Sequence, residues 1–231
     1  MLKTTSSAVD TAVTRQALQQ AAARLAVSLS EQQVSDLLAY LNLIVKWNKV
    51  YNLTAVRDPA EMLTHHLLDS LAIVAPLNRH ILQHTSGTAI NLLDVGAGAG
   101  LPGVVVAICC PQVAVTCVDA VAKKMAFVQQ VATELKLSNL KALHSRVEVL
   151  SQKFEVITSR AFATLADFVA GSQAALAPDS GVWLAMKGRD PSAEVAALPA
   201  EVTVFHVEQL TVPGLDAERC IVWMKKAIST G

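Results

Sequence analysis

The chain has 231 residues, of which 52% are hydrophobic and 16% are charged. This size and composition predict one α/β domain with a large core plus an appendage, and they exclude an intrinsically disordered protein. The longest apolar stretch, 101–110, contains a proline and a glycine and has roughly half the length of a membrane-spanning helix. The amino-terminal residues lack the apolar segment of a signal peptide, so we expect a cytoplasmic protein with no membrane partner.

Basic and acidic residues are equal in number, 19 of each, and a net charge of zero taken alone argues against a nucleic-acid-binding protein. Their distribution is uneven, because residues 120–160 hold seven basic and three acidic residues, whereas residues 161–220 hold three basic and eight acidic ones. A neutral protein with one basic face can still bind phosphates. The four cysteines form no C-x-x-C pair and have no histidine at zinc-ligand spacing, which predicts reduced core thiols and no metal site.

Residues 1–85 are expected to form a helical appendage that packs on the rest of the chain. A capping box at Ser30–Gln33 begins a helix whose apolar residues recur at helical spacing up to Ile44. A second helix begins at Asp58–Glu61, with proline at its first helical position. The polar and aromatic segment Lys46–Thr54 between them is interpreted as a non-periodic connection.

From about residue 86 to residue 231, short β-branched runs alternate with helical stretches, which predicts parallel βαβ units and a doubly wound sheet. The last two strand-like runs have no helix between them and should pair antiparallel. The predicted strands are Ile90–Val95, Val113–Val118, Leu140–His144, Phe154–Thr158, Val182–Met186, Val202–Val207 and Cys220–Met224, and the predicted helices are Pro102–Cys110, Val121–Lys136 and Thr164–Leu176.

The segment Asp94–Gly103 carries the strongest chemical signal, because a hydrophobic strand runs into a glycine loop that opens a helix. In an open α/β sheet such a loop lies at the carboxyl edge of the strands, where ligands bind. Residues 98–103 fit the dinucleotide pattern G-x-G-x-x-G, whereas Asp94-x-Gly96-x-Gly98-x-Gly100 fits the arrangement of S-adenosylmethionine enzymes. The second pattern is favoured, because Asp94 would face the cationic methionine part of that cofactor and a dinucleotide site needs no acid there.

Asp119 ends the second predicted strand, where its carboxylate can accept hydrogen bonds from both hydroxyls of a cofactor ribose. It can also be the N-cap of the helix that begins near Val121, and the two roles can coexist.

Six ordered blocks stand out along the chain: Lys46–Thr54, His66–Ser70, Asp94–Gly103, Ser145–Glu148, Ser159–Ala163 and Met186–Gly188. Together they resemble the bacterial 16S ribosomal RNA guanine-N7 methyltransferase family, also called glucose-inhibited division protein B. The resemblance covers nearly the whole chain and implies a Rossmann-like class I S-adenosylmethionine methyltransferase with a doubly wound, mostly parallel seven-stranded sheet and an N-terminal helical appendage. One departure is His65, which stands where the family commonly has arginine.

The resemblance implies contacts of the cofactor with Gly96, Leu101, Val147, Glu148 and Arg160, and with Asp119 at the ribose. It also implies the substrate, N7 of a guanine in the decoding-centre 530 loop of 16S ribosomal RNA (guanine 527). With the glycine motif included, the expected residues for S-adenosyl-L-methionine are Asp94, Gly96, Gly98, Gly100, Leu101, Asp119, Val147, Glu148 and Arg160.

Methylation at N7 needs no general base, since the N7 lone pair lies in the ring plane and is free to attack; catalysis then reduces to positioning. The residues agree, because the end of the fourth predicted strand lacks an Asn-Pro-Pro-Tyr-type motif. Arg160 and Lys187 are the expected positioning residues. Arg160 can bond guanine O6 or a phosphate, or instead form a salt bridge to Glu148 or Asp94. Lys187 can contact a phosphate or base, or simply be solvated.

The amino-terminal blocks have two interpretations. Trp47, Asn48 and Asn52 can stack on and hydrogen-bond an unpaired base, or Trp47 can pin the appendage to the sheet while the asparagines cap helices. His66 and Asp69 lie three residues apart on one helix and are expected to form a hydrogen-bonded pair at the cofactor entrance. The residues expected to contact RNA are Lys46, Trp47, Asn48, Lys49, Asn52, His66, Lys123, Lys124, Arg146 and Lys187.

The expected partner is 16S ribosomal RNA or the small ribosomal subunit, and nothing in the sequence demands more than a monomer. Two other functions fit the same chain. One is a nucleotide-dependent oxidoreductase that uses the same glycine loop, and the other is a non-catalytic RNA-binding factor on a methyltransferase fold.

Overall fold

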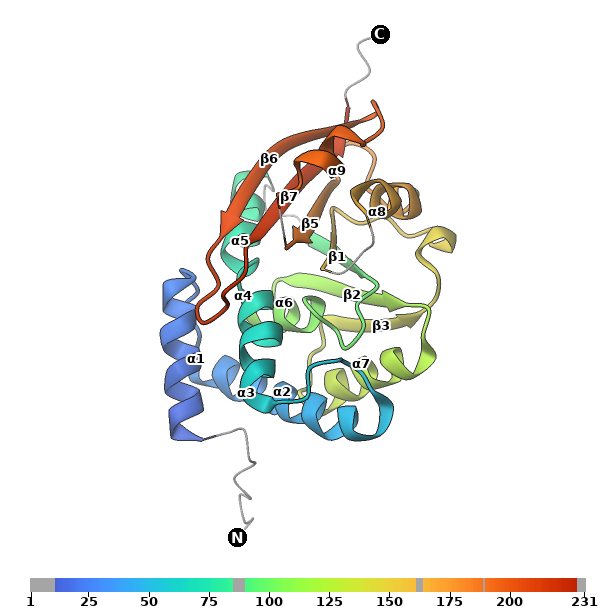
Figure 1. Ribbon diagram of the computed structural model, residues 1–231. Helices are drawn as coiled ribbons and strands as arrows, with labels where there is room; N and C mark the ends of the chain where they lie inside the picture. Colours follow the sequence, from blue (N-terminus) through green and yellow to red (C-terminus); the bar gives the residue numbers. More distant parts are fainter. Residues whose placement is uncertain (1–10, 85–89, 161–163, 189, 228–231) are drawn as a thin grey trace.

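The computed structural model describes residues 11–84, 90–160, 164–188 and 190–227. Helical elements and strands alternate from β1 to β6, β7 follows β6 directly, and helices occupy both faces of the sheet (Figure 1). The amino-terminal helical elements are α1 (Ala12–Arg24), α2 (Glu31–Tyr51), α3 (Pro59–Met62), a π-helical turn (Leu63–Leu68), α4 (Asp69–Leu71) and α5 (Val74–His84). The strands are β1 (Ile90–Val95), β2 (Val113–Asp119), β3 (Leu140–His144), β4 (Val156–Ser159), β5 (Val182–Lys187), β6 (Val202–Leu210) and β7 (Arg219–Lys226). The remaining helices are α6 (Gly103–Cys109), α7 (Ala122–Glu134), a 3-10 turn (Val147–Val149), α8 (Leu165–Ser172) and α9 (Ser192–Ala196).

The seven strands form one sheet in the order β3-β2-β1-β4-β5-β7-β6. The first five strands of this order are parallel, and β7 is antiparallel to both β5 and β6. The chain order reverses between β1 and β4, and it is outside the carboxyl ends of strands at such a reversal that open α/β sheets bind ligands. The predicted seven-stranded, mostly parallel sheet with an antiparallel end is confirmed.

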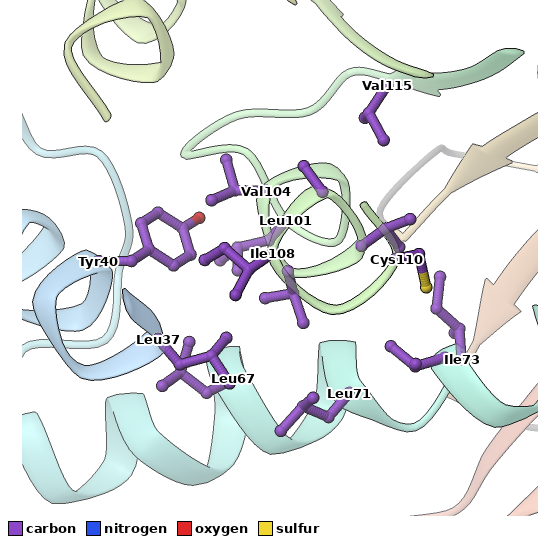
Figure 2. Close-up of a cluster of buried hydrophobic side chains, with 14 of the residues drawn as sticks. Leu37, Tyr40, Leu67, Leu71, Ile73, Leu101, Val104, Ile108, Cys110 and Val115 are labelled. Carbon is purple, nitrogen blue, oxygen red and sulfur yellow. The ribbon is translucent and has the colours of Figure 1, made fainter. Parts of the chain in front are cut away.

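The sheet separates two apolar layers, because side chains alternate along each strand. On β1, Leu92 belongs to the larger cluster and Leu93 to the smaller one. The larger cluster also holds residues of α1, α2, α6 and α7, and the smaller one is closed by α8. Figure 2 shows the larger cluster, in which Leu37 and Tyr40 of α2 and Leu67 of the π-helical turn meet Val104 and Ile108 of α6.

The amino-terminal helices therefore share a core with the sheet layer, although their division from it near residue 85 stays a prediction, since residues 85–89 lie outside the described part. Within the described residues, no helix is both long enough and apolar enough to cross a membrane.

Helix α2 begins as predicted, since Ser30 and Gln33 form both hydrogen bonds of the capping box. The interpretation of Lys46–Thr54 as a connection is wrong for its first part, because α2 continues to Tyr51. The helix extends because Trp47 packs against Phe127 of α7, with ring centroids 5.3 Å apart, and buried Asn48 bonds the following loop. The inner face of α2 thus continues through an aromatic and an amide side chain, which a search for regularly spaced apolar residues does not detect.

Two further differences concern short elements. Helix α9 is absent from the expected elements, and its five residues have no buried member that would produce a periodic apolar signal. The helix expected from Asp58 onward is interrupted by the π-helical turn, in which the Asp69 amide bonds the carbonyls of Thr64 and His66. Because of this irregular turn, the side chains that lie on the same face of the helix differ from those expected for a regular α-helix.

Candidate active site

The glycine loop after β1 is shaped by close approaches that leave no room for larger side chains. Gly100 has a φ of +88°, and a Cβ there would overlap the side chain of Val104. A Cβ on Gly103 would lie 2.5 Å from Cys117 Sγ and 2.8 Å from Asp94 Oδ2. The first turn of α6 is consequently seated directly on the end of β1.

Asp94 is fully buried beneath this loop. Its Oδ2 accepts a hydrogen bond from the Gly103 amide at 2.8 Å, whereas its Oδ1 has no hydrogen-bond partner among the described residues. Burial raises the pKa of this carboxyl to about 7, and the Gly103 amide and the Arg160 charge limit the rise. A buried acceptor with an unused oxygen suits a ligand that brings a positive charge.

Asp119 uses both oxygens to hold the neighbouring loops. Oδ1 accepts from the Val121 amide at 2.8 Å, and Oδ2 accepts from the Gly98 amide at 3.0 Å. Lys124 Nζ lies 3.5 Å from Oδ2. The N-cap of α7 is Val121 and has no side-chain capping bond, so the interpretation of Asp119 as the N-cap is wrong. Its carboxylate instead binds the amide of the N-cap residue and fixes the glycine loop.

A pocket of about 230 Å³ opens at the carboxyl ends of β1, β2 and β3. It brings together four of the predicted cofactor residues, Gly96, Asp119, Val147 and Glu148. Leu101 is not among its lining residues and packs instead in the larger apolar cluster (Figure 2). The lining is Val95, Gly96, Val118, Asp119, Ala120, Ser145, Arg146, Val147 and Glu148.

A second pocket of about 320 Å³ lies at the ends of β4 and β5, against the π-helical turn. It contains residues of three of the family-resembling blocks, represented by His66, Arg160 and Lys187. We call it the cationic pocket, defined by its lining residues Val56, His65, His66, Asp69, Arg160, Met186, Lys187, Gly188 and Arg219.

Asp69 is the buried centre of the cationic pocket and binds two arginines. Its Oδ2 lies 3.2 Å from Arg160 NH1, and its Oδ1 accepts from Arg219 Nε at 2.9 Å. Arg160 NH1 also donates to the His65 carbonyl at 2.7 Å. The salt bridge considered for Arg160, to Glu148 or Asp94, is therefore wrong in its partner, because the π-helical turn brings the Asp69 carboxylate to this side chain instead.

His66 does not pair with Asp69, so that expectation is also wrong. Its Nε2 lies 2.9 Å from Thr54 Oγ1, and its Nδ1 has no hydrogen-bond partner among the described residues. Burial first, and then the positive charge of Arg160, lower the pKa of His66 to about 4. His66 is consequently neutral at neutral pH.

Lys187 is only 14% exposed and forms an ion pair of 2.8 Å with Glu194 of α9. The same Glu194 oxygen, Oε2, accepts from the Leu165 amide at the start of α8. This pair holds the lysine at the edge of the cationic pocket rather than leaving it solvated. No group of three metal-ligating side chains occurs within the described ranges.

The other residues expected to contact RNA fall into an exposed set and a structural set. Lys46, Lys49, Lys123 and Arg146 are exposed, and Arg146 Nε lies 3.9 Å from Glu148. Asn48 is buried, with its amide group bonded to the main chain of Thr54 and Val56. Trp47 is half-buried against α7, and Asn52 is the left-handed C-cap of α2.

Sequence reasoning missed three residues of the site. Arg219 reaches Asp69 across 150 positions of sequence, and Glu194 lies on the unexpected helix α9. Tyr40, fully buried in α2, donates its hydroxyl to the Ala99 carbonyl at 2.6 Å and so braces the glycine loop. Of these three residues, only Arg219 had a sequence signal, because it is a basic residue directly before the predicted strand Cys220–Met224.

Solved structures show the same fold at low sequence identity. The N-methyltransferase NodS from Bradyrhizobium japonicum WM9, in complex with S-adenosyl-L-homocysteine, matches with a TM-score of 0.53 and 15% identity, over 79% of this chain and 98% of that chain. TrmN from Thermus thermophilus matches with a TM-score of 0.53 and 17% identity, over 68% and 49%. The predicted Rossmann-like methyltransferase fold is confirmed by these matches.

Sequence relatives are much closer. A "Ribosomal RNA small subunit methyltransferase G" from Acidovorax ebreus (strain TPSY) is 64% identical over 213 residues, covering 90% of this chain and 94% of the relative. One from Albidiferax ferrireducens is 62% identical over 218 residues, covering 92% and 97%. The family model GidB, described as rRNA small subunit methyltransferase G, matches residues 33–222. The chain therefore belongs to the rRNA small subunit methyltransferase G (GidB) family.

Proposed function

We propose that this protein transfers a methyl group from S-adenosyl-L-methionine to N7 of a guanine in the 530 loop of 16S ribosomal RNA. The observation that carries the proposal is the extent of the family match, because residues 33–222 include every lining residue of both pockets. The substrate is ribosomal RNA, which also favours the cytoplasm as its place of action.

The pocket at β1–β3, together with Asp94 and Gly98, which are not among its lining residues, fits S-adenosyl-L-methionine. Asp94 offers a buried, unpartnered carboxylate oxygen for the cationic methionine part, and Asp119 lies at the end of β2 for the ribose hydroxyls. Glycine at positions 96 and 98 leaves the loop backbone open to close approach by a ligand. When bound, this cofactor supplies an electrophilic methyl group on a sulfonium.

The cationic pocket suits an acceptor that loses no proton. Its carboxylate, Asp69, is engaged by two arginines, and the buried one of its two histidines, His66, has a strongly depressed pKa. Neither of these two buried side chains is suited to be a general base, and N7 of guanine requires none. Arg160, Arg219 and Lys187 instead supply donors for the guanine O6 and neighbouring phosphates, which position N7 for attack.

The amino-terminal helical appendage, residues 1–85, extends the RNA-binding surface. Lys46 and Lys49 on α2, Lys123 on α7 and Arg146 beside the 3-10 turn are exposed cations. We expect a monomer to bind the small subunit or its RNA through these side chains.

The decisive experiment is transfer of a labelled methyl group to small subunits purified from a strain that lacks this protein, followed by nuclease digestion and nucleoside analysis. Label in 7-methylguanosine at a single site of the 530 loop is the expected result. Label in a different nucleoside would keep the methyltransferase activity and overturn the target. Absence of label on subunits and on naked RNA, despite tight cofactor binding, would favour a non-catalytic factor.

A further inference from the structure

One carboxylate, Asp69, joins three parts of the chain that are far apart in sequence. It is 4% exposed, and its two oxygens bind Arg160 at the end of β4 and Arg219 at the start of β7. The two guanidinium groups are each about one fifth exposed at the side chain, so each presents part of its donor surface to the cationic pocket. Asp69 therefore determines where both groups point.

The π-helical turn completes this arrangement. The Asp69 amide bonds the carbonyls of Thr64 and His66, so it does not bond the carbonyl of His65 as a regular α-helix would require. Arg160 NH1 donates to that His65 carbonyl at 2.7 Å. Arg160 Nη1 is thus held by a backbone carbonyl of the π-helical turn and by the carboxylate of the residue that follows it. Two acceptors on one nitrogen restrict where the guanidinium can point.

The charge of Asp69 distinguishes a role in positioning the arginines from a simple electrostatic effect on RNA binding. Arg160, Arg219 and Lys187 carry three positive charges, and Asp69 and Glu194 oppose them with two negative ones. His66 adds no charge at neutral pH. Removal of the Asp69 charge would make the pocket more positive, so an effect through attraction alone would strengthen RNA binding.

We propose that Asp69, with the π-helical turn that precedes it, is a positioning residue that sets the orientation of Arg160 and Arg219 toward the RNA. It acts through these arginines and does not itself contact the base. This inference rests on the proposed function, since it assigns the arrangement of donors at the same site.

The test compares Asp69→Asn, which keeps the shape and removes the charge, with Asp69→Glu, which keeps the charge and shifts the carboxylate. Methyl transfer to small subunits gives kcat and KM, calorimetry gives the cofactor Kd, and salt titration gives the RNA-binding slope. Glu208→Gln is the matched control, because Glu208 forms an arginine–carboxylate pair with Arg79 away from both pockets. Thermal unfolding and circular dichroism establish that each variant is folded.

For Asp69→Asn we expect a fall in kcat of about 100-fold, with cofactor Kd within about twofold of wild type, because displacing a positioning group by about 1 Å has an effect of this size. RNA binding should be no weaker than wild type and its salt dependence no flatter. Asp69→Glu should also lose kcat, and the Asp69→Asn effect should shrink in an Arg219→Gln background. Glu208→Gln should behave as wild type.

A folded Asp69→Asn protein with wild-type kcat would overturn the inference, and so would an Asp69→Glu protein with wild-type kcat if Asp69→Asn fails to fold. RNA binding that weakens in parallel with kcat would show that Asp69 acts through affinity and not through orientation. A wild-type protein that labels no RNA overturns the proposed function and, with it, this inference. A wild-type protein that labels RNA while both variants match it overturns the inference alone.

Discussion

Asp94 is a buried carboxyl group with one unpartnered oxygen, and its protonation controls how well it attracts a cation. Since burial raises its pKa to about 7, the carboxyl is half protonated near neutral pH. S-adenosylmethionine binding is expected to strengthen as pH rises from 6 to 8, because the charged form becomes dominant. Calorimetry of wild type and Asp94→Asn over this range checks it. A pH profile that is unchanged in the Asn variant would show that another group is responsible.

The same pKa has a consequence for stability. The folded protein keeps the Asp94 proton up to about pH 7, whereas an exposed aspartate in the unfolded chain, with a pKa near 3.8, has already lost it. Stabilisation by the protonated form is thus complete below about pH 4 and is lost as pH rises toward 7, amounting to about 4 kcal/mol. Denaturant unfolding of the free protein should show this loss in wild type. Asp94→Asn should not show it, and equal slopes in both proteins would contradict the assignment.

Asp119 combines a structural and a proposed binding role, and a single substitution separates them. Asp119→Ala is expected to weaken S-adenosylmethionine binding by about 1–3 kcal/mol, because charge-assisted hydrogen bonds to the ribose are lost. It should also lower the free energy of unfolding by about 1 kcal/mol, because the Val121 amide loses its acceptor. Ser30→Ala, which removes the cap of α2, is the control for stability alone. Unchanged cofactor affinity in Asp119→Ala would leave this residue only its structural contacts with the Gly98 and Val121 amides.

At the scale of elements, the site depends on how closely α6 sits on β1. Gly103→Ala would place a Cβ 2.8 Å from Asp94 Oδ2 and 2.5 Å from Cys117 Sγ, so the helix must move away from the strand. We expect a loss of about 1–3 kcal/mol in the free energy of unfolding and weaker cofactor binding. Gly171→Ala in α8 is the control, because this glycine lies in a helix that lines neither pocket, where alanine is favoured over glycine by about 0.5–1 kcal/mol. A Gly103→Ala protein as stable as wild type would refute the argument from close packing.

The strands and the glycine loop were predictable from sequence because their signals are local. Apolar runs such as those of β2 and β5 form buried parallel strands, and the capping box at Ser30 and Gln33 marks the start of α2. The end of α2 was not predictable, since Trp47 and Asn48 form its inner face and fit no apolar repeat.

The cofactor side of the site was predicted better than the cationic pocket for the same reason. Gly96 and Asp119 lie at strand ends, where the fold alone brings them together. The pairing of Asp69 with Arg219 depends on the π-helical turn and on the position of β7, and neither has a sequence signal. Charge and spacing predicted that His66 would pair with Asp69. Burial instead keeps His66 neutral, and its hydrogen-bond partner is Thr54.

At the scale of the whole molecule, the amino-terminal helix α2 packs on the sheet layer with one side and carries exposed lysines on the other. Tyr40 and Trp47 of α2 pack on α6 and α7, so a change at the exposed side of α2 leaves the pockets in place. The exposed Lys46 and Lys49 lie on that outer side. Cofactor binding and RNA binding should therefore be separable by substitution.

Replacing Lys46 and Lys49 together by alanine is expected to spare the cofactor Kd and to weaken RNA binding. If each lysine contacts one phosphate, the slope of log K against log salt becomes shallower by about 1.4, since each contact to a single strand contributes about 0.7. The control is Lys225→Ala with Lys226→Ala, which removes the same charge at the end of β7, next to the carboxyl terminus and far from α2 (Figure 1). Equal loss of RNA affinity in both double variants would mean that RNA binding depends only on the total charge of the protein. Loss of RNA affinity only in the α2 double variant assigns the appendage to the RNA-binding surface.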